Sequence, residues 1–270
     1  MIERLRAHYG FGRTPFGRNL APSMLHQHRG HAEAVARITW LISERAIGVV
    51  TGEVGAGKTI AARAAVAALD PVRHTIVYLP NPLIGQRGLY AEIVRHLGGH
   101  PRFHKASLVA QAAELLCAED AEKAKTTVVI IDEAHLLAAE QLEEVRMLTN
   151  HEMDARSPFA CLLLGQPTLR RRVKLGTLAA LDQRIALRYH LDGMDLGETV
   201  SYVKHHLQLA GRSDQMFNDQ AIALLHQTSR GIPRAVNNLA LQALVAAFID
   251  GKGIVDEAAA RAAVTEVTGD

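Results

Sequence analysis

Short apolar runs alternate with longer amphipathic stretches between residues 46 and 192 of the 270-residue chain. The apolar runs are rich in β-branched residues and are expected to form strands at 46–51, 74–79, 126–131, 159–164 and 186–191. Helices are expected to begin between these strands, at Lys58, Gln86, Ala106, Ala138 and Thr168. Continuous apolar runs such as residues 128–131 are typical of parallel strands buried on both faces. The pattern predicts an α/β fold with a parallel sheet and helices on both faces.

After Asp192 the pattern becomes helical only. Asp195 and Glu198 have the spacing of a capping box at the start of a helix that Gly211 ends, with Asp in place of the usual Ser or Thr. Further helix starts are expected at Asn218 or Asp219, at Pro233 and at Asp256. A boundary near residues 192–195 therefore separates the α/β part from a small all-helical part.

The composition narrows the class of protein. With 48% hydrophobic and 21% charged residues, the chain can bury a core, which excludes a mostly disordered protein. No apolar run approaches the roughly 20 residues of a membrane-spanning helix, and no signal peptide is visible, so no membrane contact is expected. Cys117 and Cys161 lack CxxC spacing, which argues against a disulfide scaffold or a zinc finger and fits a cytoplasmic protein. The net charge of +2 neither demands nor excludes nucleic acid.

A glycine-rich segment between the first expected strand and helix carries the strongest signal. It matches GxxxxGK[ST] and consists of Gly52, Glu53, Val54, Gly55, Ala56, Gly57, Lys58 and Thr59. The glycines let backbone N–H groups form a nest for phosphate oxygens, and the following helix directs its positive end to the same place. Lys58 is expected to span the β- and γ-phosphates of ATP, and the Thr59 hydroxyl to ligate Mg²⁺.

Two carboxylates follow the apolar run 128–131. In an open parallel sheet, ligands bind at the carboxyl ends of the strands, where Asp132 and Glu133 are expected. Asp132 is expected to hold the metal, and Glu133 to polarise a water towards the γ-phosphate. Ala134 and His135 complete the letters DEAH, the tag of a helicase class, but such helicases need a second motor domain and this chain has one α/β domain.

With these residues in place, the chain resembles a P-loop ATPase of the AAA+ superfamily. It is most similar to the branch that contains the general-secretion ATPase ExeA and the transposition regulators TnsC and TniB. Further segments carry the likeness: Tyr9-Gly10-Phe11 with Pro15-Phe16, Leu163-Leu164-Gly165-Gln166-Pro167, Leu181-x-Gln183-Arg184-Ile185 and Gly231-Ile232-Pro233-Arg234. The resemblance implies an N-terminal segment over 1–45 packing on the ATPase core, an α/β nucleotide-binding domain over 46–193 and a helical lid over 194–270.

The resemblance also implies roles for four polar residues. Gln166 would be the polar sensor beside the γ-phosphate, and Arg234 the second sensor, reaching from the lid to the phosphates. Arg184 matches the arginine finger that acts on nucleotide held by a neighbouring subunit, and Arg188 is the substitute candidate. A finger supplied by a neighbour implies a homo-oligomer, a ring or filament, with ATP hydrolysed at subunit interfaces.

A basic loop at residues 100–105 is the candidate DNA contact. In the transposition regulators, loops in this region face a pore and touch DNA phosphates, which makes Arg102 and Lys105 candidates. A solvated loop is the equally open alternative. The cluster of Arg170, Arg171 and Arg172 is interpreted first as an inter-subunit surface.

Three functions remain open on the sequence. The first is a transposition regulator that assembles with ATP on double-stranded DNA and recruits a transposase. The second is a secretion or pilus-assembly ATPase of the ExeA type, and the third is a weakly hydrolysing nucleotide switch that serves as a scaffold. ExeA-type proteins extend into a membrane segment and an envelope domain, whereas this chain stops at Asp270, which favours the first expectation.

Overall fold

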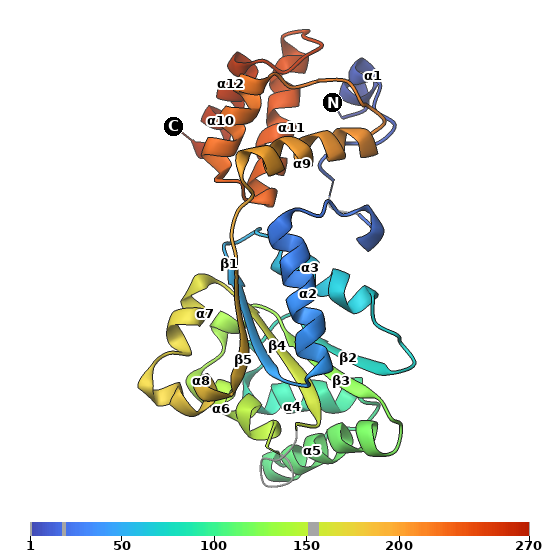
Figure 1. The fold of residues 1–270 in the computed structure, drawn as a ribbon, viewed down its shortest axis with the longest axis vertical. Coiled ribbons are helices and arrows are strands. Elements are labelled where there is room, and N and C mark those ends of the chain that lie inside the picture. The colour runs from blue at the N-terminus through green and yellow to red at the C-terminus, as the bar shows by residue number, and fades with distance from the viewer. Residues whose placement is uncertain (1, 18–19, 151–156, 270) are drawn as a thin grey trace. The chain divides into compact units, whose positions relative to one another are not determined.

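The structure, a computed structural model, describes residues 2–17, 20–150 and 157–269 (Figure 1). Contacts within the chain divide it into two units. One unit contains the sheet and comprises Ala32–Glu53 and Lys58–Leu191. The other contains the C-terminal helices and comprises Met1–His31, Val54–Gly57 and Asp192–Asp270. We call them the sheet unit and the lid unit.

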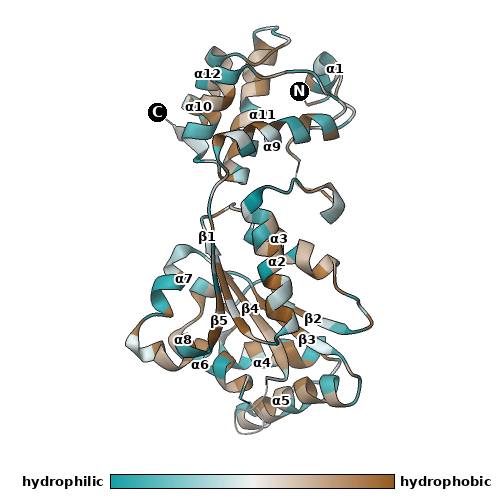
Figure 2. Ribbon diagram, viewed as in Figure 1, coloured by the Kyte–Doolittle hydropathy of each residue, from teal (hydrophilic) through white to brown (hydrophobic). Residues whose placement is uncertain are grey.

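Five parallel strands form the sheet, in the order β2-β3-β4-β1-β5. They are β1 (Ile47–Gly52), β2 (His74–Leu79), β3 (Thr126–Ile131), β4 (Phe159–Gly165) and β5 (Ile185–Leu191). The prediction is confirmed, with each boundary within one residue of its expected place. Every residue of β1 and β4 is buried, as expected of inner strands covered on both faces. In Figure 2 these strands are correspondingly brown.

Helices connect the strands of this unit, and the five that the pattern predicted begin within one residue of their expected positions. The helices are α2 (Arg29–Ser43), α3 (Lys58–Ala67), α4 (Gly85–His96), α5 (Lys105–Ala121), α6 (Ala139–Leu148), α7 (Pro167–Arg172) and α8 (Ala179–Arg184). Among the described residues of this unit, 3₁₀ turns accompany them at η2 (Ala134–Leu136), after β3, and at η4 (Gly176–Leu178), before α8. Apolar side chains from the strands and from α4, α5 and α6 form one continuous core, which holds the carboxyl ends of the strands in place.

The lid unit is helical, as predicted. Its C-terminal helices are α9 (Leu196–Leu209), α10 (Asp219–Ser229), α11 (Pro233–Ile249) and α12 (Glu257–Thr268). The capping box is formed: the Glu198 N–H donates to Asp195 Oδ1 at 2.7 Å, and the Asp195 N–H donates to Glu198 Oε2 at 3.0 Å. Asn218 and Asp256 likewise accept N–H groups at the starts of α10 and α12. Local capping chemistry therefore sets these helix starts.

The N-terminal segment differs from the expectation that residues 1–45 pack together on the ATPase core. Helix α1 (Ile2–Tyr9) and the residues after it belong to the lid unit, whereas residues 32–45 belong to the sheet unit. The physical reason is the apolar set Tyr9, Phe11 and Phe16, which is buried in the core of the lid helices. The Tyr9 hydroxyl also donates to the Leu244 carbonyl of α11 at 3.1 Å.

Candidate nucleotide site at the carboxyl ends of the strands

The glycine-rich loop joins the end of β1 to the start of α3. Gly55 and Gly57 adopt φ angles of 85° and 103°, a region that side chains other than glycine rarely enter. Lys58, the first residue of α3, is buried, and its Nζ donates to the carbonyls of Gly52 at 2.9 Å and Glu53 at 3.0 Å. The loop therefore combines a helix N-terminus, glycine torsions and a buried ammonium group. This donor set fits the phosphate groups of a nucleotide.

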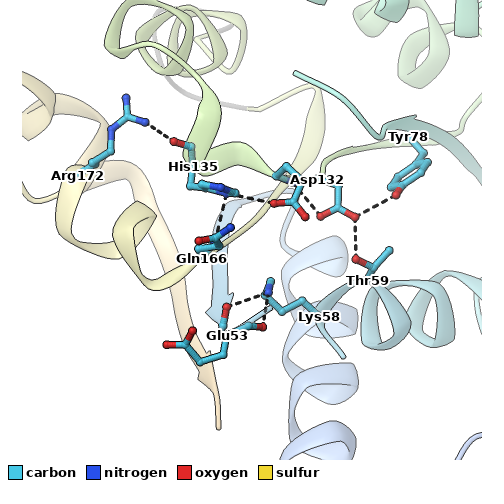
Figure 3. Close-up of polar contacts among 10 residues, drawn as sticks. Glu53, Lys58, Thr59, Tyr78, Asp132, His135, Gln166 and Arg172 are labelled. Atoms are coloured by element: carbon cyan, nitrogen blue, oxygen red, sulfur yellow. Dashed lines mark hydrogen bonds and ion pairs between the residues drawn. The ribbon is translucent and has the colours of Figure 1, made fainter. Parts of the chain in front are cut away.

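Asp132 follows β3 and is the centre of a hydrogen-bonded group (Figure 3). Its side chain is buried, and its Oδ2 accepts from the Thr59 hydroxyl at 2.7 Å and from the Tyr78 hydroxyl at 3.0 Å. The backbone N–H of Glu133 donates to its other oxygen at 2.9 Å. A threonine hydroxyl beside a carboxylate is an oxygen donor pair of the kind that Mg²⁺ accepts together with phosphate oxygens. The residues present therefore fit the expected metal.

Tyr78 is a member of this group that the sequence analysis did not identify. It lies one residue before the end of β2 and pairs with Ile130 of β3, which brings it close to Asp132. Partial burial and the neighbouring carboxylate of Asp132 raise the pKa of Tyr78 to about 12, so its hydroxyl stays protonated and donates. The sequence did contain a signal for it: Tyr78, whose side chain has a polar tip, lies near the end of the expected strand 74–79.

Glu133 and Gln166 lie at the same edge of the sheet. Glu133 has a left-handed backbone with φ of 50°, and its side chain is half-exposed. Gln166 follows β4, whose last residue, Gly165, pairs with Thr51 of β1. Parallel pairing thus brings the ends of β1, β3 and β4 together, and with them Lys58, Asp132, Glu133 and Gln166. His135 lies between Glu133 and Gln166 and contacts both.

Arg184 and Arg188 lie elsewhere on the sheet. Arg184 immediately precedes β5, whose first residue pairs with Ile47 at the beginning of β1. Five residue steps of about 3.3 Å, roughly 17 Å, separate Ile47 from Gly52 at the other end of β1. The Arg184 guanidinium donates to the Thr149 hydroxyl at 3.0 Å, and Arg188 forms an ion pair with Asp182 at 2.9 Å. Arg184 therefore lies beside the beginning of β1, away from Gly52, and the Arg188 side chain contacts Asp182 and the Ile185 carbonyl toward the same end.

Arg234 belongs to the lid unit, together with Val54–Gly57 of the loop. It is the second residue of α11, its side chain is exposed, and its N–H donates to the Gly55 carbonyl at 3.3 Å. A Cβ at position 55 would lie 2.5 Å from the Arg234 Cβ. Position 55 thus requires glycine for its left-handed torsion and also for this close approach.

The two DNA candidates differ in their surroundings. Lys105 Nζ forms an ion pair with Glu144 and donates to Gln86 Oε1 as well. Its positive charge is therefore already matched within the chain. The Arg102 side chain is exposed, while its backbone N–H donates to Gln111 Oε1 at 3.0 Å. Arg102 is therefore the candidate whose side chain lies more openly at the surface, and the DNA contact of both residues stays a prediction.

The three arginines of the cluster after β4 also differ in exposure and in contacts. Arg170 and Arg171 are exposed, as an interaction surface requires. Arg172 is half-buried and donates to the carbonyls of His135 and Leu137. One of the three arginines therefore has a role inside the domain.

The residues that the structure describes offer few groups for other kinds of site. No group of three or more His, Cys, Asp or Glu side chains in the described part of the chain is arranged to hold a metal ion. The Thr59–Asp132 pair would thus need phosphate oxygens and water to complete a Mg²⁺ shell, which is the usual arrangement for this ion. Among the helices that the structure describes, none is both long and apolar enough to span a membrane.

Comparison with known sequences agrees with the loop and the acidic strand end. Residues 41–173 match the family model described as "AAA domain". General secretion pathway protein A from Aeromonas hydrophila is 32% identical over 265 residues, which is 97% of this chain and 48% of that protein. The chain therefore spans about half the length of this relative.

Comparison with solved structures agrees on the fold. The Aeropyrum pernix ORC2 protein in its ADP form matches with a TM-score of 0.66 and 20% identity, over 93% of this chain and 71% of that one. Cdc6p from Pyrobaculum aerophilum matches with a TM-score of 0.66 and 14% identity, over 89% and 67%. The Holliday junction branch migration motor RuvB of Thermotoga maritima matches with a TM-score of 0.52 and 18% identity, over 87% and 68%. With the loop and the acidic strand end in place, these matches show that residues 41–173 are similar to an AAA domain and that the chain has the AAA+ fold.

Proposed function

We propose that this chain is an ATPase module of general secretion, which binds and hydrolyses Mg²⁺-ATP at the carboxyl ends of its strands. The observation that carries the chemistry is the contact between Thr59 and Asp132 at 2.7 Å, beside the buried Lys58. The observation that favours secretion is the 32% identity to general secretion pathway protein A over 97% of the chain.

Each residue of the site has a defined task in this proposal. The loop N–H groups and Lys58 bind the phosphates, and Thr59 and Asp132 hold Mg²⁺, whose charge when bound offsets that of the phosphate oxygens. Glu133 accepts a proton from the attacking water, since its half-exposed carboxylate lies next to the metal-binding pair. Gln166 and Arg234 are proposed to contact the γ-phosphate side of the nucleotide, as the resemblance implies.

Hydrolysis is proposed to depend on a second copy of the chain. Arg184 lies at the amino end of β5, beside the beginning of β1, whereas the other end of β1 leads into the phosphate loop. An arginine finger contributes about 10³–10⁵ in rate. If Arg184 supplies it to a neighbour, isolated chains bind ATP and hydrolyse it slowly, and assembled chains hydrolyse it fast. ATP then joins subunits in a homo-oligomer, and its hydrolysis releases them.

The transposition role has less support than the sequence suggested. That expectation relied on the chain ending at Asp270, and a chain that spans 48% of its relative allows no conclusion from its end. The ion pair of Lys105 with Glu144 also offsets the charge of one of the two candidate DNA cations. Recruitment of a transposase on double-stranded DNA stays the alternative, with the weakly hydrolysing switch as the third possibility.

Phosphate release from ATP by the purified chain, with and without duplex DNA, tests these alternatives. The proposal expects Mg²⁺-dependent turnover that rises with protein concentration, is unaffected by DNA and is lost in Lys58→Ala. Turnover that requires duplex DNA would favour the transposition role. Tight ATP binding without turnover at any protein concentration would favour the switch.

A chimera tests the link to secretion. The chain replaces the matching half of general secretion pathway protein A in Aeromonas hydrophila, and export of a secreted enzyme is measured. Export with the active chimera and its loss with the Lys58→Ala chimera would support the proposal. Equal export with both would contradict it.

A further inference from the structure

His135 occupies a position that the assigned residues do not explain. Its side chain is 11% exposed, and its Nδ1 lies 3.3 Å from Oε2 of Glu133. The same nitrogen lies 3.5 Å from the backbone nitrogen of Gln166, which follows β4. Figure 3 shows the ring between Gln166 and the carboxylates at the end of β3. One ring atom thus contacts both the proposed base and the strand that carries the polar sensor.

These two contacts make opposite demands on Nδ1. To bind the Glu133 carboxylate, Nδ1 must carry a hydrogen and donate it. To bind the Gln166 N–H, the same nitrogen must be bare and accept. A neutral imidazole satisfies one of the two at a time, so the hydrogen on Nδ1 decides which partner is bound. Binding Glu133 therefore excludes binding the backbone at the end of β4.

The backbone of His135 is held independently of its ring. Arg172 of α7 donates to the carbonyl of His135, within the turn η2, and to that of Leu137, directly after it. On the other side, a Cβ at Gly165 would lie 3.2 Å from the His135 backbone nitrogen, so β4 packs closely against the turn. The ring consequently starts from a fixed point and can orient the Glu133 side chain, which is half-exposed.

We infer that His135 is a positioning residue for Glu133. When Nδ1 carries a hydrogen, it holds the Glu133 carboxylate near the end of β4; when it carries none, it binds the backbone N–H of Gln166 instead. Arg172 fixes the turn from which it acts. The inference rests on the proposed ATPase function and assigns to this chain's DEAH letters a task unrelated to helicase chemistry. A fixed carboxylate orients one water, whereas a loose one does so only part of the time.

Isosteric substitutions test the atom concerned. The side-chain amide of Asn places a donor and an acceptor at the level of Nδ1, whereas that of Gln reaches the level of Nε2. We expect His135→Ala to lower kcat by about 10–100-fold, the effect of misplacing a catalytic group by about 1 Å, with KM for ATP within about twofold. His135→Asn is expected to restore most of kcat, and His135→Gln to restore little.

A second pair of variants tests the anchor. Arg172→Lys loses the two-pronged contact to the carbonyls and is expected to lower kcat about threefold to tenfold, again with KM nearly unchanged. Arg73→Met, which removes an exposed arginine of the same unit, is the control and is expected to keep wild-type kcat. Thermal melting of each variant shows that the fold is retained.

The outcomes separate this inference from the proposed function. If the wild type turns over ATP and the kcat of His135→Ala lies within twofold of the wild-type value, the inference would be overturned and the proposed function would stand. Rescue by Gln with no rescue by Asn would also overturn it, because the effect would then belong to Nε2. A wild-type chain that binds a fluorescent ATP analogue and releases no phosphate at any protein concentration would overturn the proposed function, and this inference with it.

Discussion

The polar groups at the two ends of the parallel strands have different partners. At the carboxyl ends, Lys58, Thr59 and Asp132 contact loop carbonyls or one another and form a site within one chain. At the amino ends, Arg184 contacts Thr149, and the phosphate-binding loop of the same chain lies at the far end of β1. The first end therefore forms its candidate site within one chain, whereas the proposed role of Arg184 requires a second copy.

Of the substitutions at the two strand ends, Lys58→Ala should have the largest effect on ATP binding and turnover, because it removes the buried ammonium group at the carboxyl ends. Losing its charge-assisted hydrogen bonds to phosphate should weaken ATP binding about 10–100-fold, corresponding to about 1.5–3 kcal/mol, and abolish measurable turnover. Titration with a fluorescent ATP analogue measures the first effect. Binding at wild-type affinity would remove this end of the sheet from the nucleotide site.

Arg184→Ala should act only when chains assemble. Turnover at high protein concentration should fall about 10³–10⁵-fold, whereas ATP affinity in dilute chains should stay unchanged, because the arginine is remote from its own loop. Turnover is measured as a function of protein concentration, with Arg188→Ala beside it as the matched variant. A large loss with Arg188→Ala in place of Arg184→Ala would transfer the role to Arg188.

Mixing experiments sharpen the same comparison. Arg184→Ala and Glu133→Gln subunits, each inactive, should regain part of the turnover when combined, since some interfaces then contain both groups. No recovery at any mixing ratio would oppose an arginine supplied by a neighbour.

Glu133→Gln should lower turnover about 10²–10⁴-fold while ATP stays bound, because the amide keeps the size of the side chain and loses its basicity. Assemblies formed with ATP should also last longer, which light scattering measures. Loss of nucleotide binding in this variant would show that Glu133 supports the loop and does not act on water.

Tyr78→Phe should have the smallest effect at the carboxyl ends. It removes one of the hydrogen bonds to Asp132, and Thr59 stays in place, so the Mg²⁺ concentration at half-maximal turnover should rise only a few-fold. Because the pKa of Tyr78 is raised to about 12, its hydroxyl is protonated throughout the neutral range. The wild-type to variant ratio should thus be constant from about pH 6 to about pH 9. A ratio that changed in this range would contradict the role of the hydroxyl as a donor to Asp132.

Much of the fold followed from local sequence pattern. Apolar runs predicted the strands within one residue, and capping residues such as Asp195, Asn218 and Asp256 predicted the lid helices, because each depends on neighbours a few positions away. The glycine-rich loop and Asp132 were found for the same reason, because the groups that identify them are consecutive residues at a strand end.

The remaining features depend on residues far apart in the chain. The strand order β2-β3-β4-β1-β5 brings Tyr78 to Asp132 and His135 to Gln166, and no short segment records that order. Likewise, only the packed structure pairs Lys105 with Glu144 and buries Tyr9 and Phe11 among the lid helices. The sequence by itself determined which residues are candidates for binding phosphate and metal, because such a site needs adjacent groups at a strand end. The tertiary structure decided which side chains orient or neutralise them, because those contacts exist only once distant segments pack.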